Sequence, residues 1–321
     1  AVGRSSAAMS VVQSSAGRAS RSATRYSNGP EVAACGPTPS ARARDLDEEA
    51  VGKRAVEGRR GVAAAGEVLD GTGSPAACDE LGIPHPATQV VDFSGAAADG
   101  WTAPAVESPF PVVAKPATTS QYETLKFPGK KKVYFLDTQA DYDDMVRVLR
   151  ASGFTGQFLV QQLIGGDDTY MRSVTAYRDQ FGETTLLCSA HVLLEEHSPT
   201  ALGNPAAMFT TALPDLWESA VKFLDHMDYK GFANFDVKVD PKDGTGYFLE
   251  MNSRIGRNNY YVTAAGANVA EFVVTDVVEN RPHAPVRVEN EILYTVLFKP
   301  FLMRYVLDPA LRERVNAAAR N

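Results

Sequence analysis

The stretch that decides the fold is Phe232–Asn252, which reads FANFDVKVDPKDGTGYFLEMN. Its first eight residues alternate, so the apolar side chains at 233, 235, 237 and 239 face one side of a strand and the polar ones face the other. The PKDGT sequence that follows is typical of a tight turn, and GYFLEMN predicts a returning strand. The stretch therefore predicts an antiparallel hairpin in which Asp240 pairs with Gly246.

This pairing places charged groups opposite each other on the polar face of the hairpin. Asp236 then lies opposite Glu250, and Asn234 lies opposite Asn252, with about 5 Å between the Cβ atoms of each pair. Two facing carboxylates repel each other unless a cation lies between them, and carboxylate and amide oxygens suit Mg²⁺. The sequence predicts a magnesium site of Asp236, Glu250 and Asn252; the alternative is an ordinary exposed polar face.

The chain beyond residue 78 predicts a mixture of helices and short strands. Strands are expected at residues 111–114, 133–136, 158–164, 172–177 and 185–194, and helices at 138–149, at 216–227 and in a segment that ends near 81. The helix at 138–149 begins with a capping box, Thr138-x-x-Asp141, and carries an apolar stripe. Because hairpins alternate with helices, the expected fold class is α+β with antiparallel sheets.

The overall charge and composition exclude several classes of protein. The chain has 321 residues with 32 basic and 39 acidic side chains, and this net charge of −7 argues against sequence-independent nucleic-acid binding. The most apolar segment, 292–307, is interrupted by Lys299, Pro300 and Arg304, so no membrane span is expected. The three cysteines are widely spaced and form neither a CxxC motif nor a disulfide framework, which indicates a cytoplasmic location.

The first 70 residues differ from the rest of the chain. They contain no Ile, Phe or Trp, and Ala, Ser and Gly supply 32 of the 70 residues. Such a segment cannot bury enough apolar surface to offset the entropy lost on ordering it. Three interpretations are open: a disordered tail, a transit peptide, or a stretch that is not the natural start of the protein, which is the one we favour.

The residues around the predicted hairpin make the sequence similar to the ATP-grasp ligases. Asp236 with the segment Glu250–Arg254 (EMNSR) resembles the acid and the E-x-N motif that hold Mg²⁺ in that family. The segment Pro111–Pro116 looks like the strand whose lysine reaches the ATP phosphates, and Phe158–Asp168 looks like the hinge that binds adenine and ribose. The resemblance implies an ATP-grasp fold of two α+β subdomains, with ATP and Mg²⁺ as cofactors. The nucleotide-binding residues that it implies are Lys115, Gln161, Gln162, Ile164 and Asp168, with Asp167 as the fallback for Asp168.

A closer resemblance is to carboxylate–amine ligases of cell-wall synthesis, the bacterial D-aspartate ligases. It is carried by Pro128–Phe135 (PGKKKVYF), His191–Thr200 (HVLLEEHSPT) and Gly256–Gly266 (GRNNYYVTAAG). It implies a ligase that joins the β-carboxylate of D-aspartate to the side-chain amine of a peptidoglycan precursor. The implied partners are this small amino acid and an amine-bearing peptide precursor, not a nucleic acid. The alternatives are a dipeptide ligase, a carbamoyl-phosphate-synthase-like enzyme, and an ATP-binding remnant without turnover.

The resemblance and the charges together assign roles to individual side chains. Lys115 and Arg254 are the predicted catalytic residues, because forming an acyl phosphate brings several negative charges into one pocket. The predicted substrate-binding residues are Arg172, His197, Arg257, Asn258 and Asn259. The loop with Glu195, Glu196 and His197 is expected to receive the amine and its proton.

Alternatives stay open for three of these features. Arg172 would instead pair with the acids at 167 and 168, and His197 would instead be a structural loop residue. The basic cluster Lys130–Lys132 is either a phosphate clamp or a solvated patch.

The expected organisation has five segments. They are a low-complexity segment at 1–70, a linker or remnant of an N-terminal domain at 71–110, the small ATP-grasp subdomain at 111–164, the large subdomain with the Mg²⁺ site at 165–285, and a helical extension at 286–321. The family normally has an N-terminal α/β domain and a further ATP-binding lysine, whose position falls near Gly71. Residues 1–70 do not look like that domain, and a truncated or misassembled gene start would explain both departures.

Overall fold

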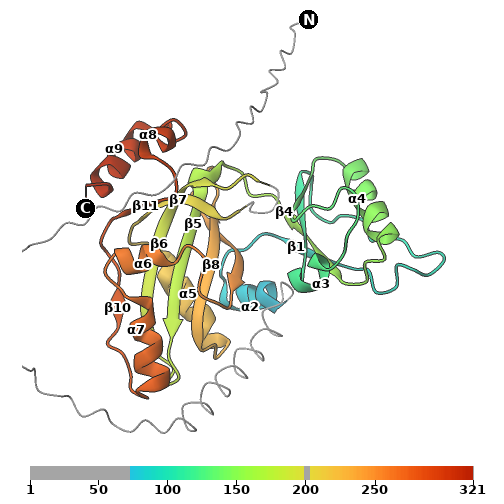
Figure 1. The fold of residues 1–321 in the computed structure, drawn as a ribbon. Coiled ribbons are helices and arrows are strands. Elements are labelled where there is room, and N and C mark those ends of the chain that lie inside the picture. The colour runs from blue at the N-terminus through green and yellow to red at the C-terminus, as the bar shows by residue number, and fades with distance from the viewer. Residues whose placement is uncertain (1–72, 199–202, 321) are drawn as a thin grey trace, which may run out of the picture. The chain divides into compact units, whose positions relative to one another are not determined.

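The computed structural model describes residues 73–198 and 203–320, in which helices pack on two sheets (Figure 1). The predictions for residues 1–70 and for the lysine position near Gly71 lie outside the described residues. The strands pair antiparallel, except that β10 pairs parallel with β6. This combination of helices with antiparallel sheets confirms the predicted α+β class.

The smaller sheet has four strands in the order β1-β4-β2-β3. Its elements are β1 (Thr88–Asp92), β2 (Val112–Pro116), α3 (Thr119–Glu123), β3 (Tyr134–Leu136), α4 (Gln139–Ala151) and β4 (Gln157–Gln162). The predicted capping box of α4 is present, because the Thr138 hydroxyl accepts from the Asp141 amide and the Asp141 carboxylate accepts from the Thr138 amide. Tyr142, Met145 and Leu149 of the predicted stripe are buried in the core of this sheet.

The larger sheet runs in the order β11-β7-β6-β5-β8-β9, with β10 alongside β6. Its strands are β5 (Met171–Arg178), β6 (Thr184–Glu195), β7 (Pro205–Thr210), β8 (Gly231–Val239), β9 (Gly246–Asn252), β10 (Val286–Arg287) and β11 (Leu293–Thr295). A 3₁₀ turn, η1 (Asp168–Tyr170), follows β4 and leads directly into β5. The predicted hairpins β5–β6 and β8–β9 therefore lie side by side through the β5–β8 pair.

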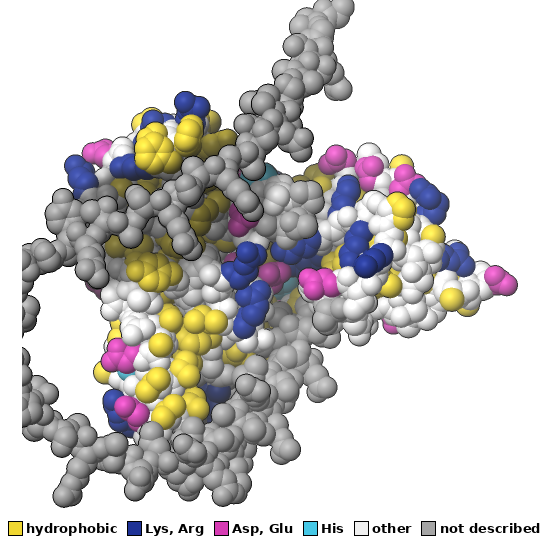
Figure 2. Space-filling view, in the orientation of Figure 1, with side chains coloured by type: hydrophobic (Ala, Val, Ile, Leu, Met, Phe, Trp, Pro, Cys, Tyr) yellow, Lys and Arg dark blue, Asp and Glu magenta, His cyan; other side chains and the backbone are white. Residues whose placement is uncertain are grey.

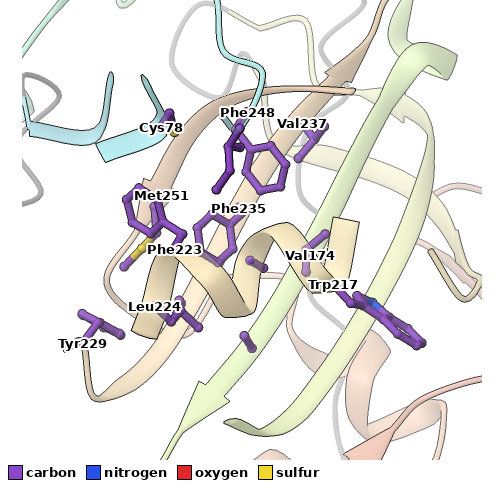
Figure 3. Close-up of a cluster of buried hydrophobic side chains, with 14 of the residues drawn as sticks. Cys78, Val174, Trp217, Phe223, Leu224, Tyr229, Phe235, Val237, Phe248 and Met251 are labelled. Atoms are coloured by element: carbon purple, nitrogen blue, oxygen red, sulfur yellow. The ribbon is translucent and has the colours of Figure 1, made fainter. Parts of the chain in front are cut away.

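One face of the larger sheet is apolar and is covered by α5 (Pro214–His226), with α2 (Gly73–Leu81) contributing to the same core. Figure 3 shows Phe235 and Val237 of β8 and Phe248 of β9 directed into this cluster. The ring centroid of Phe235 lies 5.7 Å from that of Phe223 on α5 and 5.6 Å from that of Phe248. The alternation predicted for β8 is confirmed on this side, because its odd-numbered apolar residues form the core.

The opposite face of the larger sheet is covered by short helices. These are α6 (Tyr260–Ala264), α7 (Val269–Val273) and a π-helical turn, η2 (Val274–Val278). Tyr261 and Val262 of α6 are buried there with Cys188 of β6 and Met208 of β7.

Two further helices, α8 (Lys299–Leu302) and α9 (Pro309–Ala318), pack against β6 and β7 through an apolar core of their own. Figure 2 shows apolar and basic side chains together on the exposed surface of these helices. Within residues 73–198 and 203–320, no helix has the length and apolar content needed to cross a bilayer.

Two of the expected segments differ in the structure from what was expected. The segment 71–110, expected as a linker, holds β1, which pairs with β4 of the smaller sheet, and α2, whose Ala77 and Cys78 are buried in the core of the larger one. The segment 286–321, expected to be helical, also supplies β10 and β11 to the larger sheet. Strands of two and three residues are too short to show an alternating pattern, so the sequence gives no signal for them.

Candidate active site

The end of the β8–β9 hairpin that carries the predicted metal ligands, called the metal end below, has the predicted pairing. Asp236 lies opposite Glu250, and Asn234 lies opposite Asn252. All four side chains therefore share the face that is not covered by α5. The neighbouring strand β5 places Ser173 opposite Asp236, so the carboxylate pair is flanked by a small polar residue.

At the turn end of the same hairpin, the register differs from the predicted one. Gly246 pairs with Val239 and not with Asp240, because Asp240 belongs to the turn, where its carboxylate and carbonyl accept amide hydrogen bonds. The ladder then shifts directly after Asp236, with Leu249 as the additional residue on β9. This β-bulge returns the strands to the register in which the carboxylates face each other.

Lys115, on β2 of the smaller sheet, reaches the metal end of this hairpin. Its ammonium donates a hydrogen bond to Glu250 Oε2 at 3.0 Å and lies 3.5 Å from the Leu249 carbonyl oxygen. The Lys115 side chain is only 19% exposed, so solvent screens the ion pair incompletely. The structure thus brings the predicted phosphate-binding lysine together with a predicted metal ligand.

The two facing carboxylates have opposite pKa shifts. Lys115 is the main cause that lowers the pKa of Glu250 to about 2. The pKa of Asp236 is raised well above its usual range, first by burial and then by the charges of Glu250 and Glu195. Glu250 is therefore ionised, whereas ionisation of Asp236 is opposed by its surroundings. A cation between the two groups would stabilise both negative charges.

The side chains of this pair fit a hard divalent cation. Asn252 Nδ2 lies 3.4 Å from Asp236 Oδ2 and 3.2 Å from Glu250 Oε1, so the amide is next to both carboxylates. In the part of the chain that the structure describes, no group of three or more His, Cys, Asp or Glu is arranged to hold a metal ion. A site here has two carboxylates and an amide, which suits an ion such as Mg²⁺ that keeps waters and shares substrate phosphates.

Arg254 lies two residues after Asn252, the last of the predicted metal ligands. Its guanidinium is exposed, and Nη2 lies 3.5 Å from Asn252 Oδ1. The structure therefore places a forked cation next to Asn252 and the ammonium of Lys115 next to Glu250. This combination of cations and acids is suited to binding phosphate oxygens.

The predicted hinge joins the two sheets, and its glutamines are used within the smaller one. The Gln161 amide donates to the Thr88 hydroxyl at 2.9 Å, and the Gln162 backbone amide donates to the Ala87 carbonyl at 2.9 Å. Ile164 is buried after the end of β4. Because the Gln161 side chain is occupied in this way, contacts from this strand to a nucleotide would come from its backbone.

The two acids after the hinge have different roles. Asp167 caps η1, because its carboxylate accepts from the Thr169 amide at 2.9 Å and from the Thr169 hydroxyl at 2.6 Å. The carboxylate of Asp168 instead accepts from the Glu195 backbone amide at 2.9 Å and lies 2.8 Å from His197 Nε2. The contact with Asp168 raises the pKa of His197. His197 is therefore brought to the predicted ribose-binding acid.

Lys238 is a charged residue near the site that the sequence analysis did not single out. It lies two residues after Asp236 on the polar face of β8, and its ammonium donates to the Asp167 carbonyl at 2.7 Å. Burial lowers the pKa of Lys238, while the charge of Glu195 opposes that shift. Burial also raises the pKa of Glu195, and the charge of Asp168 adds to this shift. The alternation of β8 contained the signal, since residues 234, 236 and 238 share one face.

Arg172 is not brought to the metal end. It lies opposite Val237, whose side chain belongs to the core under α5. Its guanidinium donates to the carbonyls of Thr169 and Met171, at 2.8 Å each, rather than to the acids at 167 and 168. Burial lowers the pKa of Arg172 to about 10, and the charge of Arg314 adds to this shift.

The loop after Arg254 carries three predicted substrate-binding residues. Arg257 is exposed, and the amide of Asn258 lies 3.9 Å from Met208 Sδ. Asn259 is only 4% exposed, and neither polar atom of its side chain has a hydrogen-bond partner among the described residues. A buried amide without partners is unfavourable, and hydrogen bonds from a ligand would satisfy it.

The three lysines of the basic cluster 130–132 have different surroundings. Lys130 donates to three backbone carbonyls at the end of α3, at 2.8, 2.9 and 3.0 Å, so it is neither a phosphate clamp nor a solvated side chain. Lys131 lies over a tyrosine ring, with 5.7 Å from its ammonium to the ring centroid. The charge of Lys132 opposes the rise in the pKa of Glu195 and adds to the fall in the pKa of Glu250 that Lys115 mainly causes.

Comparisons with known proteins agree with this geometry. The family model described as carbamoyl-phosphate synthase L chain, ATP binding domain, matches residues 82–272. The D-aspartate ligase of Enterococcus faecium (strain Aus0004) is 35% identical over 205 residues, which are 64% of this chain and 48% of that protein. The chain thus spans about half the length of this curated relative.

Solved structures share the fold at lower identity. A biotin carboxylase–β-γ-ATP complex from Campylobacter jejuni has a TM-score of 0.51 and 14% identity, covering 71% of this chain and 50% of that one. Rhizobium etli pyruvate carboxylase also has a TM-score of 0.51 and 14% identity, covering 71% of this chain and 20% of that one. Because the family model spans more than half of the chain and includes the strands that carry Lys115, Asp236 and Glu250, the chain belongs to the ATP-grasp family of carbamoyl-phosphate synthase ATP-binding domains.

Proposed function

We propose that this protein is an ATP-dependent carboxylate–amine ligase that forms an amide bond through an acyl phosphate. The observation that carries the proposal is the Lys115–Glu250 ion pair, which joins β2 of the smaller sheet to the carboxylate pair of β8 and β9. An ion pair beside a second, half-buried carboxylate is a poor stabilising device, because partial burial of Asp236 opposes its charge. It is a suitable site for triphosphate and metal.

The nucleotide would lie along the hinge and reach this pair. We propose that backbone groups from Gln161 to Ile164 contact the adenine and that Asp168 holds the ribose hydroxyls. Mg²⁺ held by Asp236, Glu250 and Asn252 would neutralise the phosphate charge. Lys115 would then bind phosphate oxygens with the ammonium that now contacts Glu250.

The reaction would have two displacements. A carboxylate oxygen of the first substrate attacks the γ-phosphorus, the bond to the β–γ bridging oxygen breaks, and ADP leaves. The amine nitrogen of the second substrate then attacks the acyl carbon, phosphate leaves with its oxygen, and the nitrogen gives up a proton. Arg254, whose guanidinium lies near Asn252, would hold phosphoryl oxygens in both steps. Glu195 is a candidate acceptor for the proton, because burial raises its pKa.

D-aspartate is the carboxylate substrate that we propose, and the amine of a cytoplasmic peptidoglycan precursor is the acceptor. The proposal rests on the 35% identity to a D-aspartate ligase and on the loop after Arg254. There, Arg257 and Asn258, with the buried and unpartnered amide of Asn259, would bind the α-carboxylate and α-amine of the amino acid. His197 lies on the loop that we expect to meet the acceptor.

Trapping the acyl phosphate tests this function without the natural acceptor. The chain is incubated with ATP, Mg²⁺ and D-aspartate in the presence of hydroxylamine, and both the aspartyl hydroxamate and ADP are measured. Equal amounts of the two products that depend on D-aspartate, with little product from L-aspartate, are expected. ADP formation with bicarbonate in place of any amino acid would instead support a carbamoyl-phosphate-synthase-like reaction. No hydroxamate with any amino acid would contradict the ligase proposal.

A further inference from the structure

The arginine of the candidate site is carried by a loop, and the loop is held from beneath by buried hydrogen bonds. The carbonyl oxygen of Arg254 accepts a short hydrogen bond from the side-chain amide of Asn234 on β8. The oxygen of the same amide accepts from the Thr175 hydroxyl on β5 at 2.7 Å. That hydroxyl lies 2.7 Å from the phenol oxygen of Tyr261 on α6. Strands β5 and β8 are thereby joined to the Arg254 loop and to α6 in one chain of hydrogen bonds.

The direction of each bond in this chain is fixed. The single hydroxyl proton of Thr175 is donated to Asn234, so the remaining proton between Thr175 and Tyr261 must come from the phenol. Burial raises the pKa of Tyr261, which keeps the phenol protonated and able to donate. The Asn234 amide is then oriented with its nitrogen toward Arg254. The Tyr261 phenol also has Ser173 of β5 as a hydrogen-bond partner, but Thr175 is the side chain that links it to Asn234.

This chain of hydrogen bonds is buried and lies close to the backbone of the Arg254 loop. Thr175 is 0% exposed, Tyr261 1% and Asn234 8%, so water cannot readily substitute for a lost partner. The loop also approaches Asn234 at Gly256, where an added Cβ would lie 3.3 Å from Asn234 Oδ1 and 3.1 Å from Asn258 Oδ1. The loop conformation therefore depends on the same amide that fixes the Arg254 carbonyl.

We infer that Tyr261, Thr175 and Asn234 are positioning residues that hold the Arg254 loop in place for phosphoryl and carboxylate binding. The inference rests on the proposed ligase function for its catalytic consequence. Its structural part stands on the hydrogen bonds alone. α6 begins directly after Asn259. The same hydrogen bonds therefore also connect the residues that are predicted to bind the amino-acid substrate with the sheet that carries the predicted metal ligands.

The test removes one hydroxyl and keeps the shape of the side chain. Thr175→Val breaks the bonds to Asn234 and Tyr261, whereas Thr175→Ser keeps the hydroxyl and serves as the conservative rescue. Thr185→Val is the matched control, because Thr185 is also buried in the larger sheet, but among the described residues its hydroxyl makes only one long contact, 3.5 Å to the Tyr177 carbonyl. Hydrogen exchange of the amides of residues 253–259 is measured by mass spectrometry, together with hydroxamate formation.

Thr175→Val is expected to speed exchange in residues 253–259 at least tenfold relative to its effect on β6, and to lower kcat for hydroxamate about tenfold with the KM for ATP within twofold. Thr175→Ser and Thr185→Val are expected to behave as the wild type. A rise in exchange that is equal throughout β5, β6 and β8 would show a merely structural role and overturn the inference. If the wild type makes no hydroxamate, the proposed function fails, and the exchange measurement still decides the positioning role.

If Thr175→Val does not fold, Tyr261→Phe provides the second variant. It removes only the outer donor and leaves the Thr175–Asn234 and Asn234–Arg254 bonds possible. A smaller acceleration of exchange, about threefold and again confined to residues 253–259, is expected. Unchanged exchange of that loop in Tyr261→Phe would overturn the part of the inference that includes Tyr261.

Discussion

The two faces of strand β8 differ in what they require of a side chain. On one face, Phe235 and Val237 are buried beneath α5 in an apolar core. On the other face, Asn234, Asp236 and Lys238 each have polar or charged neighbours from another element. The first face gains stability from burial, whereas the second keeps charges close together at a cost in stability. We expect substitutions on the two faces to separate stability from activity.

Phe235→Ala is the substitution with the largest expected effect. It removes a fully buried ring that contacts Phe223 and Phe248, so we expect the free energy of unfolding to fall by about 3–5 kcal/mol. Urea unfolding followed by circular dichroism measures the change. Phe181→Ala is the matched control, because Phe181 is 50% exposed and its loss should change stability by less than about 1 kcal/mol. Equal losses in the two variants would remove the distinction between the faces.

Glu250→Gln tests the polar face. We expect at least about a 100-fold loss of Mg²⁺-dependent hydroxamate formation, because one charged metal ligand is lost. Stability should change little, since the repulsion of Asp236 is relieved while the ion pair with Lys115 is lost.

Glu218→Gln supplies the control for this change. It makes the same chemical change at an exposed position on α5, over the opposite face, and should leave turnover intact. Normal turnover of Glu250→Gln at limiting Mg²⁺ would show that Glu250 is not a metal ligand.

The hairpin illustrates how far the sequence alone leads. Alternation and the turn residues predicted β8, β9 and the Asp236–Glu250 pairing, because side chains in a strand follow a period of two. The pairing at the turn was wrong, since a one-residue bulge at Leu249 depends on contacts that alternation does not encode. The α4 helix was predicted with its capping box, because both partners of that box are local in sequence.

Contacts between distant segments account for most of what the sequence missed at the candidate site. Lys238 was overlooked because its partner, the Asp167 carbonyl, lies 71 residues away. The bond chain from Tyr261 through Thr175 to Asn234 was overlooked for the same reason. Lys115 was placed by resemblance to a family, and the roles of the predicted site residues remain predictions.

His191 gives a smaller effect that depends on pH. His191 is on β6, opposite Arg172 of β5, on the same side of the sheet as the α5 core. Its Nε2 contacts the Thr169 carbonyl at 2.6 Å. Burial, together with the charges of Arg172 and Arg314, lowers the pKa of His191 to about 3. The unfolded chain therefore binds the proton first as the pH falls. Stability is retained at pH 7 and is lost as the pH falls below about 6.5 toward 3, by about 2 kcal/mol at pH 5.

Comparison with His191→Gln isolates this contribution. Glutamine keeps a donor for the Thr169 carbonyl but does not titrate, so the variant should lose about 2 kcal/mol less than the wild type between pH 7 and pH 5. Urea unfolding at the two pH values measures the difference. Parallel loss of stability in both proteins would show that His191 does not titrate in this window.

Lys115→Ala has the smallest expected effect. It tests the contact between Lys115 of the smaller sheet and Glu250 of the larger sheet. Without the ammonium, Glu250 loses both its ion-pair partner and the main cause of its low pKa. We expect the dissociation constant for ATP with Mg²⁺ to rise about tenfold, equivalent to about 1.4 kcal/mol, and turnover to fall with it.

The controls for this variant separate charge from geometry. Lys115→Arg keeps the charge in a different shape and should give an intermediate result. Lys222→Ala, exposed on α5, should leave ATP binding unchanged. Added Mg²⁺ should stabilise Lys115→Ala against urea more than it stabilises the wild type, because the cation then replaces the missing charge beside Glu250. Isothermal titration calorimetry measures the first effect, and a dissociation constant and turnover that both stay at the wild-type values would leave Lys115 as a structural lysine of β2.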